Sequence, residues 1–185
     1  MNSTLQAYLQ FASTRIEQFI DWTGRSISWL VLAMVLVTFL VVVLRYVFDT
    51  GWIALQESTS YLHSVVFLVG AAYTLKQNAH VRVDIFYDRL SKTGKAWVDL
   101  FGHLFILMPV MLFILWVSWP YVVDAWRVHE GSREAGGLPG VYLLKSLILI
   151  MASLLMLQGV ALIFKAILKI TVPAALNEMH RETSR

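Results

Sequence analysis

The sequence predicts an all-α integral membrane protein that crosses a lipid bilayer with four transmembrane helices. Hydrophobic residues make up 58% of the chain and charged residues only 15%, whereas soluble proteins carry about 25% charged residues. Four runs hold no Asp, Glu, Lys or Arg: residues 26–44, 58–75, 100–123 and 146–164. At about 1.5 Å per residue they reach roughly 27–36 Å, which matches a hydrocarbon core of about 30 Å. They lack the alternation of barrel strands, so helices are the structure that satisfies their backbone groups in lipid.

The first element, residues 1–25, is predicted to be an amphipathic helix. Its apolar residues recur at steps of three and four, namely Leu5, Tyr8, Leu9, Ala12, Ile16, Phe19 and Ile20. Such a helix either lies at the membrane interface or continues the first span; a helix that packs on a partner protein fits the pattern equally well. The apolar run that follows is too long for a cleaved signal peptide, so we expect it to remain as an anchor.

The basic residues predict that both termini lie in the cytoplasm. With four spans, the N-terminus, the loop between the second and third spans and the tail 165–185 share one side of the membrane. Together they hold eleven of the fifteen lysines and arginines. Loops rich in Lys and Arg stay on the cytoplasmic side.

The two longer loops are predicted to differ in structure, within a single membrane domain of residues 1–185. Residues 80–84 alternate polar and apolar side chains, which indicates a short extended segment, followed by a short interfacial helix broken near Gly94. Residues 124–145 form the other loop, predicted to be irregular and on the outer face, because it contains Gly131, Gly136, Gly137, Pro139 and Gly140.

Only two ionisable residues, His63 and His103, lie within the predicted spans. Two histidines can hold a haem, so an electron-transfer protein is one alternative function. Their depths oppose it, because His63 lies roughly 9 Å from the outer end of the second span and His103 roughly 6 Å from the inner end of the third. Interhelical hydrogen bonding or headgroup contact is the favoured role. The chain has no cysteine, which excludes disulfides and thiolate metal sites.

Helix pairing offers four further candidates. Arg45 ends the first span and Glu57 begins the second, so a hairpin predicts an ion pair between them; the alternative is two solvated flanking charges. Gly70 and Thr74 form a small-residue pair, which predicts that the second span is the packing spine of the bundle. Gln158 in the fourth span is a candidate interhelical hydrogen-bond donor.

The sequence shows no acidic residue within a span, no phosphate-binding glycine loop, no metal-ligand cluster and no nucleophile–base pair. It also lacks the paired broken helices of inverted-repeat transporters. We therefore predict no enzymatic activity and no cofactor. An accessory subunit fits better than a stand-alone exporter, which remains an alternative.

Several motifs occur together in one order: Glu57 opening the second span, Gly70-Ala71-Ala72, His80-Val81-Arg82-Val83-Asp84, the Gly/Pro-rich loop 132–142 and Leu157-Gln158-Gly159. Over residues 24–168 this pattern resembles the small, DctQ-like membrane subunit of tripartite ATP-independent periplasmic (TRAP) transporters. The resemblance implies a scaffold in the bacterial inner membrane, with no substrate or ion site of its own. It implies as partners a large multi-span subunit that moves substrate with sodium, a periplasmic substrate-binding protein and membrane lipids, but no nucleic acid.

The resemblance also assigns roles to loop residues. It implies that His80, Arg82 and Asp84 form an inner corner against the large subunit; the alternative is a solvated basic loop. The segment ending at Pro139 looks like a branch that takes organic acids such as keto acids. Many members carry a tryptophan pair after this proline, where this chain has residues 140–142 (GVY), which puts the family's outer-loop contacts in doubt here.

Overall fold

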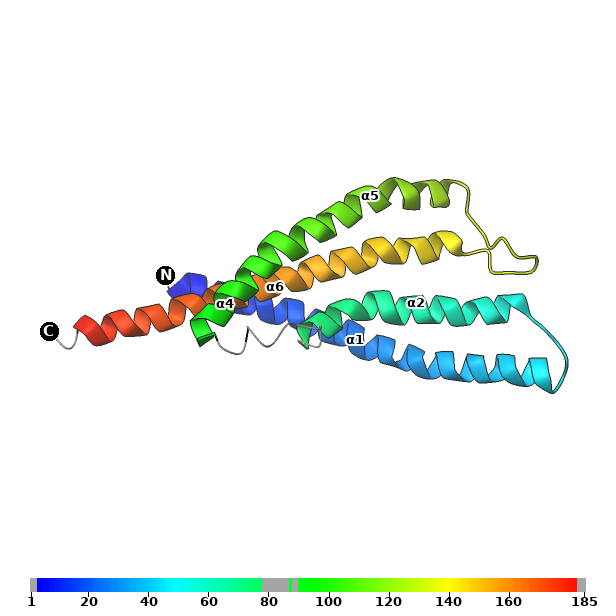
Figure 1. The fold of residues 1–185 in the computed structure, drawn as a ribbon, viewed down its shortest axis with the longest axis horizontal. Coiled ribbons are helices and arrows are strands. Elements are labelled where there is room, and N and C mark those ends of the chain that lie inside the picture. Colours follow the sequence, from blue (N-terminus) through cyan, green and yellow to red (C-terminus); the bar gives the residue numbers. More distant parts are fainter. Residues whose placement is uncertain (1–2, 78–86, 88–89, 183–185) are drawn as a thin grey trace.

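The computed structural model describes residues 3–77, 87 and 90–182, which contain helices and no strand. The helices are α1 (Ser3–Tyr46), α2 (Ile53–Lys76), α4 (Lys92–Phe101), the π-helix η1 (Gly102–Leu107), α5 (Met108–Arg127) and α6 (Val141–Glu182). In Figure 1, α1 begins and α6 ends at the same end of the molecule, and the α1–α2 and α5–α6 loops lie at the opposite end. The prediction of an all-α chain is confirmed.

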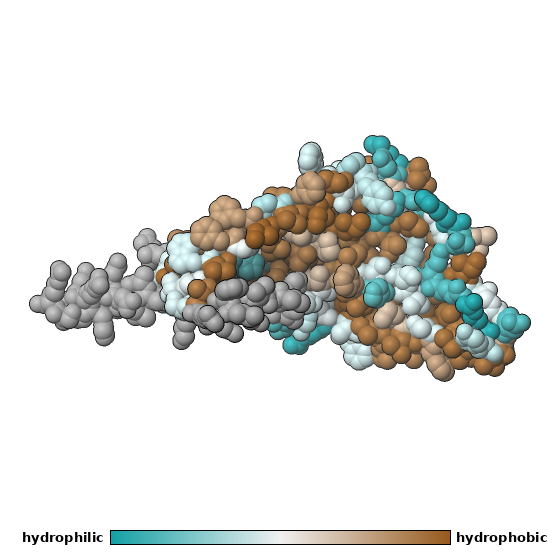
Figure 2. Space-filling model, viewed as in Figure 1, coloured by the Kyte–Doolittle hydropathy of each residue, from teal (hydrophilic) through white to brown (hydrophobic). Residues whose placement is uncertain are grey.

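The helices expose apolar side chains, as a membrane protein does. Phe39 is 66% exposed, Phe67 69% and Trp116 76%. Figure 2 shows hydrophobic side chains over much of the length of the helices and hydrophilic ones gathered at the end that carries the two loops. Exposed apolar surface of this extent marks contact with lipid or with partner proteins.

Three helices in the described part of the chain are long and apolar enough to cross a membrane: Thr4–Tyr46, Thr93–Arg127 and Val141–Thr171. The second predicted span corresponds to α2, whose 24 residues reach about 36 Å. Its first half carries three serines, a threonine and His63, and these polar side chains lower its hydropathy relative to the other three helices.

Helices extend beyond the predicted spans at both ends of the chain. The amphipathic segment and the first span form one uninterrupted helix of 44 residues, so the arrangement in which it continues the span is the one observed. At the other end of the chain, α6 begins at Val141. The irregular part of the predicted loop 124–145 is therefore shorter, because α5 extends to Arg127.

The predicted short interfacial helix, broken near Gly94, lies partly outside the described residues; within them, Gly94 does not interrupt a helix. Helix α4 runs through Gly94, whose N–H donates to the side chain of its N-cap residue Ser91 at 3.1 Å, and η1 joins α4 to α5. The irregularity lies later, where the Met108 N–H donates to the His103 carbonyl five residues back. Pro109 follows, and a proline both lacks an N–H and crowds the carbonyl four residues earlier. Widening the preceding turn accommodates it.

Helix α6 is the packing centre of the bundle. It contacts α1, α2, α4, η1 and α5, and its buried small residues Ala152, Ala161 and Ala166 let these helices approach closely. Helix α2 contributes Ala72, which is 1% exposed, but a Cβ added to Gly70 would meet no other atom within 4 Å. The prediction that the second span is the packing spine of the bundle is therefore wrong, because α6 has that role.

Candidate functional site

One carboxylate joins the two helical hairpins. Glu57 lies near the start of α2, just before the charge-free run, and its side chain reaches the loop between α5 and α6. The Ser132 hydroxyl donates to Glu57 Oε1, and the Leu138 N–H donates to Glu57 Oε2 at 2.6 Å. The Ser132 N–H also donates to the Leu138 carbonyl at 3.0 Å. We call these three residues the loop clasp.

The loop clasp favours the ionised form of its carboxyl group. The hydrogen bond from Ser132, and then that from the Leu138 N–H, lower the pKa of Glu57 from its ordinary value, against a smaller opposing effect of burial. Both bonds are donated to a negative charge, the stronger kind of hydrogen bond in proteins. The clasp is therefore formed at neutral pH.

Two glycines allow the loop to close on Glu57. Gly136 has a φ of 82°, a conformation that is unfavourable for residues with a Cβ. At Gly137 a Cβ would stand 2.4 Å from Ser132 Oγ and 2.8 Å from Glu57 Oε2. The close approach of loop and carboxylate therefore requires glycine at position 137.

An ion pair holds the same loop to α6. Lys145 pairs with Glu130, and its ammonium lies 3.9 Å from the centre of the Tyr121 ring on α5. The hydrogen bond to Glu130 is the main reason that the pKa of Lys145 is raised, and burial opposes it. Nearby, Trp126 Nε1 donates to Ser146 Oγ at 2.8 Å. The end of α5 and the start of α6 are thus fixed to each other.

A charge cluster joins three helices at the opposite end of the bundle, where the termini lie. Lys76 of α2 pairs with Asp21 of α1 and donates to the Glu17 carbonyl at 3.3 Å. Lys165 of α6 pairs with the Glu17 side chain. These four residues, which we call the charge cluster, connect α1, α2 and α6.

The structure gives Glu57 different partners from the one considered in the sequence. Arg45 lies in the last turn of α1, and no ion pair joins it to Glu57 although both residues are described. A cation in the last turn of a helix interacts favourably with the helix dipole. Pro139 follows the clasp, and its Cα would stand 3.4 Å from a Cβ at Gly131, so the two ends of the loop are in contact.

The remaining candidates are not brought together. Gly70 faces open space on α2. Gln158 is 0% exposed, and its amide nitrogen and oxygen have no hydrogen-bond partner in the described part of the chain; the predicted interhelical bond is not formed there. His80, Arg82 and Asp84 lie outside the described residues.

The two histidines of the spans contact their own helical segments. His63 stacks on Phe67, with ring centres 6.1 Å apart. The His103 ring nitrogen Nδ1 contacts the Asp99 carbonyl. Among the described residues, no group of three His, Cys, Asp or Glu could hold a metal ion.

Sequence reasoning missed the partners in both sites. Glu17 and Asp21 lie four residues apart on one face of a helix, which is a signal that they act together. Ser132 and Leu138 carried no such signal, because their role depends on a contact with Glu57 across 75 and 81 residues.

Comparison with known proteins gives one family. The family model described as "Tripartite ATP-independent periplasmic transporters, DctQ component" matches residues 34–169. This range holds the whole loop clasp and begins after the two acidic residues of the charge cluster. No curated protein and no solved structure matches the chain.

Proposed function

The chain belongs to the DctQ family, a component of tripartite ATP-independent periplasmic transporters, and we propose that it is the scaffold of such a transporter. In this proposal it holds a large, sodium-coupled membrane subunit during uptake of an organic acid that a periplasmic binding protein delivers. The DctQ family is a transporter component and not an enzyme family. The observation that carries the scaffold role is the loop clasp, which fixes the two hairpins to each other.

A scaffold must keep its shape while its partner moves. The loop clasp holds one end of the bundle through Glu57, and the charge cluster holds the other through Lys76 and Lys165. Between them, small residues of α6 pack closely against the neighbouring helices. Two fixed ends and a packed centre favour one rigid unit over a chain that changes conformation during transport.

The proposal includes four membrane crossings in the bacterial inner membrane, with both termini in the cytoplasm. Three helices have the length and composition to span, and we propose α2, which packs against α1, as the fourth. The start of α1 and the end of α6 lie at one end of the molecule (Figure 1), as an even number of crossings requires. In the same arrangement His80, Arg82 and Asp84 fall on the cytoplasmic side, where we propose that they contact the large subunit.

The scaffold role is tested by removing the chain from its transporter. Cells that make the large subunit and the binding protein but not this chain should lose uptake, and a plasmid copy should restore it. The large subunit should copurify with a tagged copy of the chain. Normal uptake without the chain would contradict the proposal. Transport by the purified chain alone would favour a stand-alone exporter, and a Soret band would favour a haem protein.

A further inference from the structure

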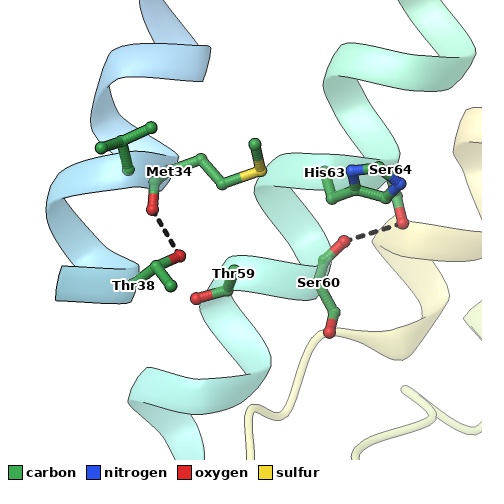
Figure 3. A pocket seen from close by; sticks show the side chains of 7 residues that line it. Met34, Thr38, Thr59, Ser60, His63 and Ser64 are labelled. Carbon is green, nitrogen blue, oxygen red and sulfur yellow. Dashed lines mark hydrogen bonds between the residues drawn. The ribbon is translucent and has the colours of Figure 1, made fainter. Parts of the chain in front are cut away.

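A groove of about 510 Å³ opens between α1 and α2 on the surface of the bundle. Met34 and Thr38 line it from α1, and Thr59, Ser60 and His63 are among the residues that line it from α2. Figure 3 shows the Met34 side chain reaching from α1 toward α2. Apolar atoms form most of the groove's surface, but five of its seven lining residues carry a hydroxyl group or an imidazole, which is unusual for a surface that faces lipid.

The polar groups of the groove fall into two sets. The hydroxyls of Thr38 and Ser64 donate to carbonyls of their own helices, at 2.7 and 2.8 Å (Figure 3). Within the described part of the chain, Thr59, Ser60 and His63 make no hydrogen bond through their side chains; His63 only stacks on Phe67. The second set is therefore available to another molecule.

The depth of the groove limits what that molecule is. His63 lies six residues past Glu57, so it stands roughly 9 Å inside the outer end of the predicted span 58–75. Headgroups occupy only about 5–8 Å on each side of the hydrocarbon core, and lipid tails offer neither donor nor acceptor. An imidazole at this depth is expensive to leave unpaired, so a polypeptide that brings its own polar group is the occupant that fits.

We propose that this groove is the docking site for a membrane helix of the large transporter subunit that presents a hydrogen-bonding side chain to His63. The proposal rests on the scaffold function, because that function supplies a membrane partner. Polar side chains that bond across helices specify which faces meet in a bilayer, where apolar surfaces alone do not distinguish lipid from protein.

Cross-linking in native membranes tests the occupant directly. The chain has no cysteine, so Ser60→Cys provides a single attachment point on this chain for a photoactivatable maleimide, applied to the complete transporter. We expect an adduct with a membrane segment of the large subunit, identified by mass spectrometry. Adducts with lipid alone, or with a second copy of this chain, would overturn the docking site. If the large subunit still copurifies in that case, the scaffold function stands while the docking site fails.

Matched variants test the hydrogen bond. His63→Leu should reduce the copurified large subunit about threefold, the fold-change expected for one interhelical hydrogen bond of about 0.6 kcal/mol. His63→Gln should retain it, because an amide both donates and accepts. Thr74→Val is the control, since that hydroxyl lies on α2 outside the groove and is already bonded to the Gly70 carbonyl, and it should leave the yield unchanged. Equal yields for His63→Leu and wild type, or equal losses for Leu and Gln, would contradict the proposed bond.

Discussion

The Glu57 carboxylate and the Leu138 backbone N–H, 81 residues apart in the chain, are joined by a hydrogen bond of 2.6 Å. The bond connects the start of α2 to the loop that precedes α6. Because Ser132 donates to the other oxygen of the same carboxylate, both acceptor atoms are used. A single side chain therefore sets how the α1–α2 hairpin stands relative to the α5–α6 hairpin at this end of the bundle.

Glu57→Gln should weaken assembly of the transporter. The amide keeps one acceptor oxygen but loses the negative charge, so one of the two bonds is lost and the other is weakened. We expect less copurified large subunit and a proportionally lower maximal uptake rate, with an unchanged apparent affinity for substrate. Glu134→Gln is the control, because that exposed side chain lies on the same loop outside the clasp. Full assembly with a tenfold shift in substrate affinity would show that this chain contributes to the transport site.

The loop clasp should open in acid. The pKa of Glu57 is lowered in the folded protein from the ordinary 4.5, so its contribution to stability is fully present above 4.5. It is lost as the pH falls through the lower folded value. Hydrogen exchange of the segment 131–138 should therefore be protected at pH 7 and at pH 5 and lose protection below the folded pKa, after correction for the intrinsic pH dependence of exchange. In Glu57→Gln the segment should be weakly protected at every pH; an identical acid response in both proteins would assign the transition to another group.

The helices could be predicted from the sequence because lipid imposes a simple local rule. A run without charges that is long enough to cross the bilayer must form a helix, and all four predicted spans lie within helices. Gly94 does not interrupt α4, because a glycine costs a helix only about 1 kcal/mol and the Ser91 cap starts the helix before it. The irregularity arises instead before Pro109, where the missing N–H is a stronger constraint.

The sites could be predicted only in part. Glu57 stood out because a carboxylate at the end of a span requires a partner, but its partners lie in a distant loop, and one of them is a backbone group with no residue signature. The role of α6 as the packing centre could not be predicted either. Its own residues are apolar on all sides of the helix, and hydropathy does not distinguish its packed face from its lipid face. Contacts between distant segments, and not local composition, decide both features.

The crossing of α1 and α2 should be sensitive to size at Gly24. A Cβ there would stand 2.4 Å from two ring carbons of Tyr73, close to the backbone of α2, so the helices would have to separate. We expect Gly24→Ala to lower the unfolding free energy in detergent by about 1–3 kcal/mol. Gly70→Ala, at a site with open space, should raise it by about 0.5–1 kcal/mol through helix propensity. A neutral effect at Gly24 would mean that the two helices are farther apart than the structure shows.

The proposed topology makes a direct prediction for reporter fusions. A reporter that is active only in the periplasm should be active when fused after Gly136, in the loop between α5 and α6. It should be silent when fused after Lys92 or Arg185, because the eleven basic residues of those segments and the N-terminus favour the cytoplasm. The reverse pattern would overturn the orientation, and activity after Lys92 together with Gly136 would mean that the third crossing is absent.

The buried amide of Gln158 should lower the stability of the isolated chain. It is 0% exposed, and neither of its polar atoms has a partner among the described residues, so folding removes them from water without replacing the lost hydrogen bonds. A buried unpaired polar group costs about 1–3 kcal/mol, and an apolar group of similar shape avoids that cost. Gln158→Leu should therefore raise the unfolding free energy of the chain in detergent. Gln158→Ala is the comparison, because it also removes the amide but leaves a cavity that offsets the gain. A loss of stability in Gln158→Leu would show that a water molecule or a backbone carbonyl pairs with this amide in the folded protein.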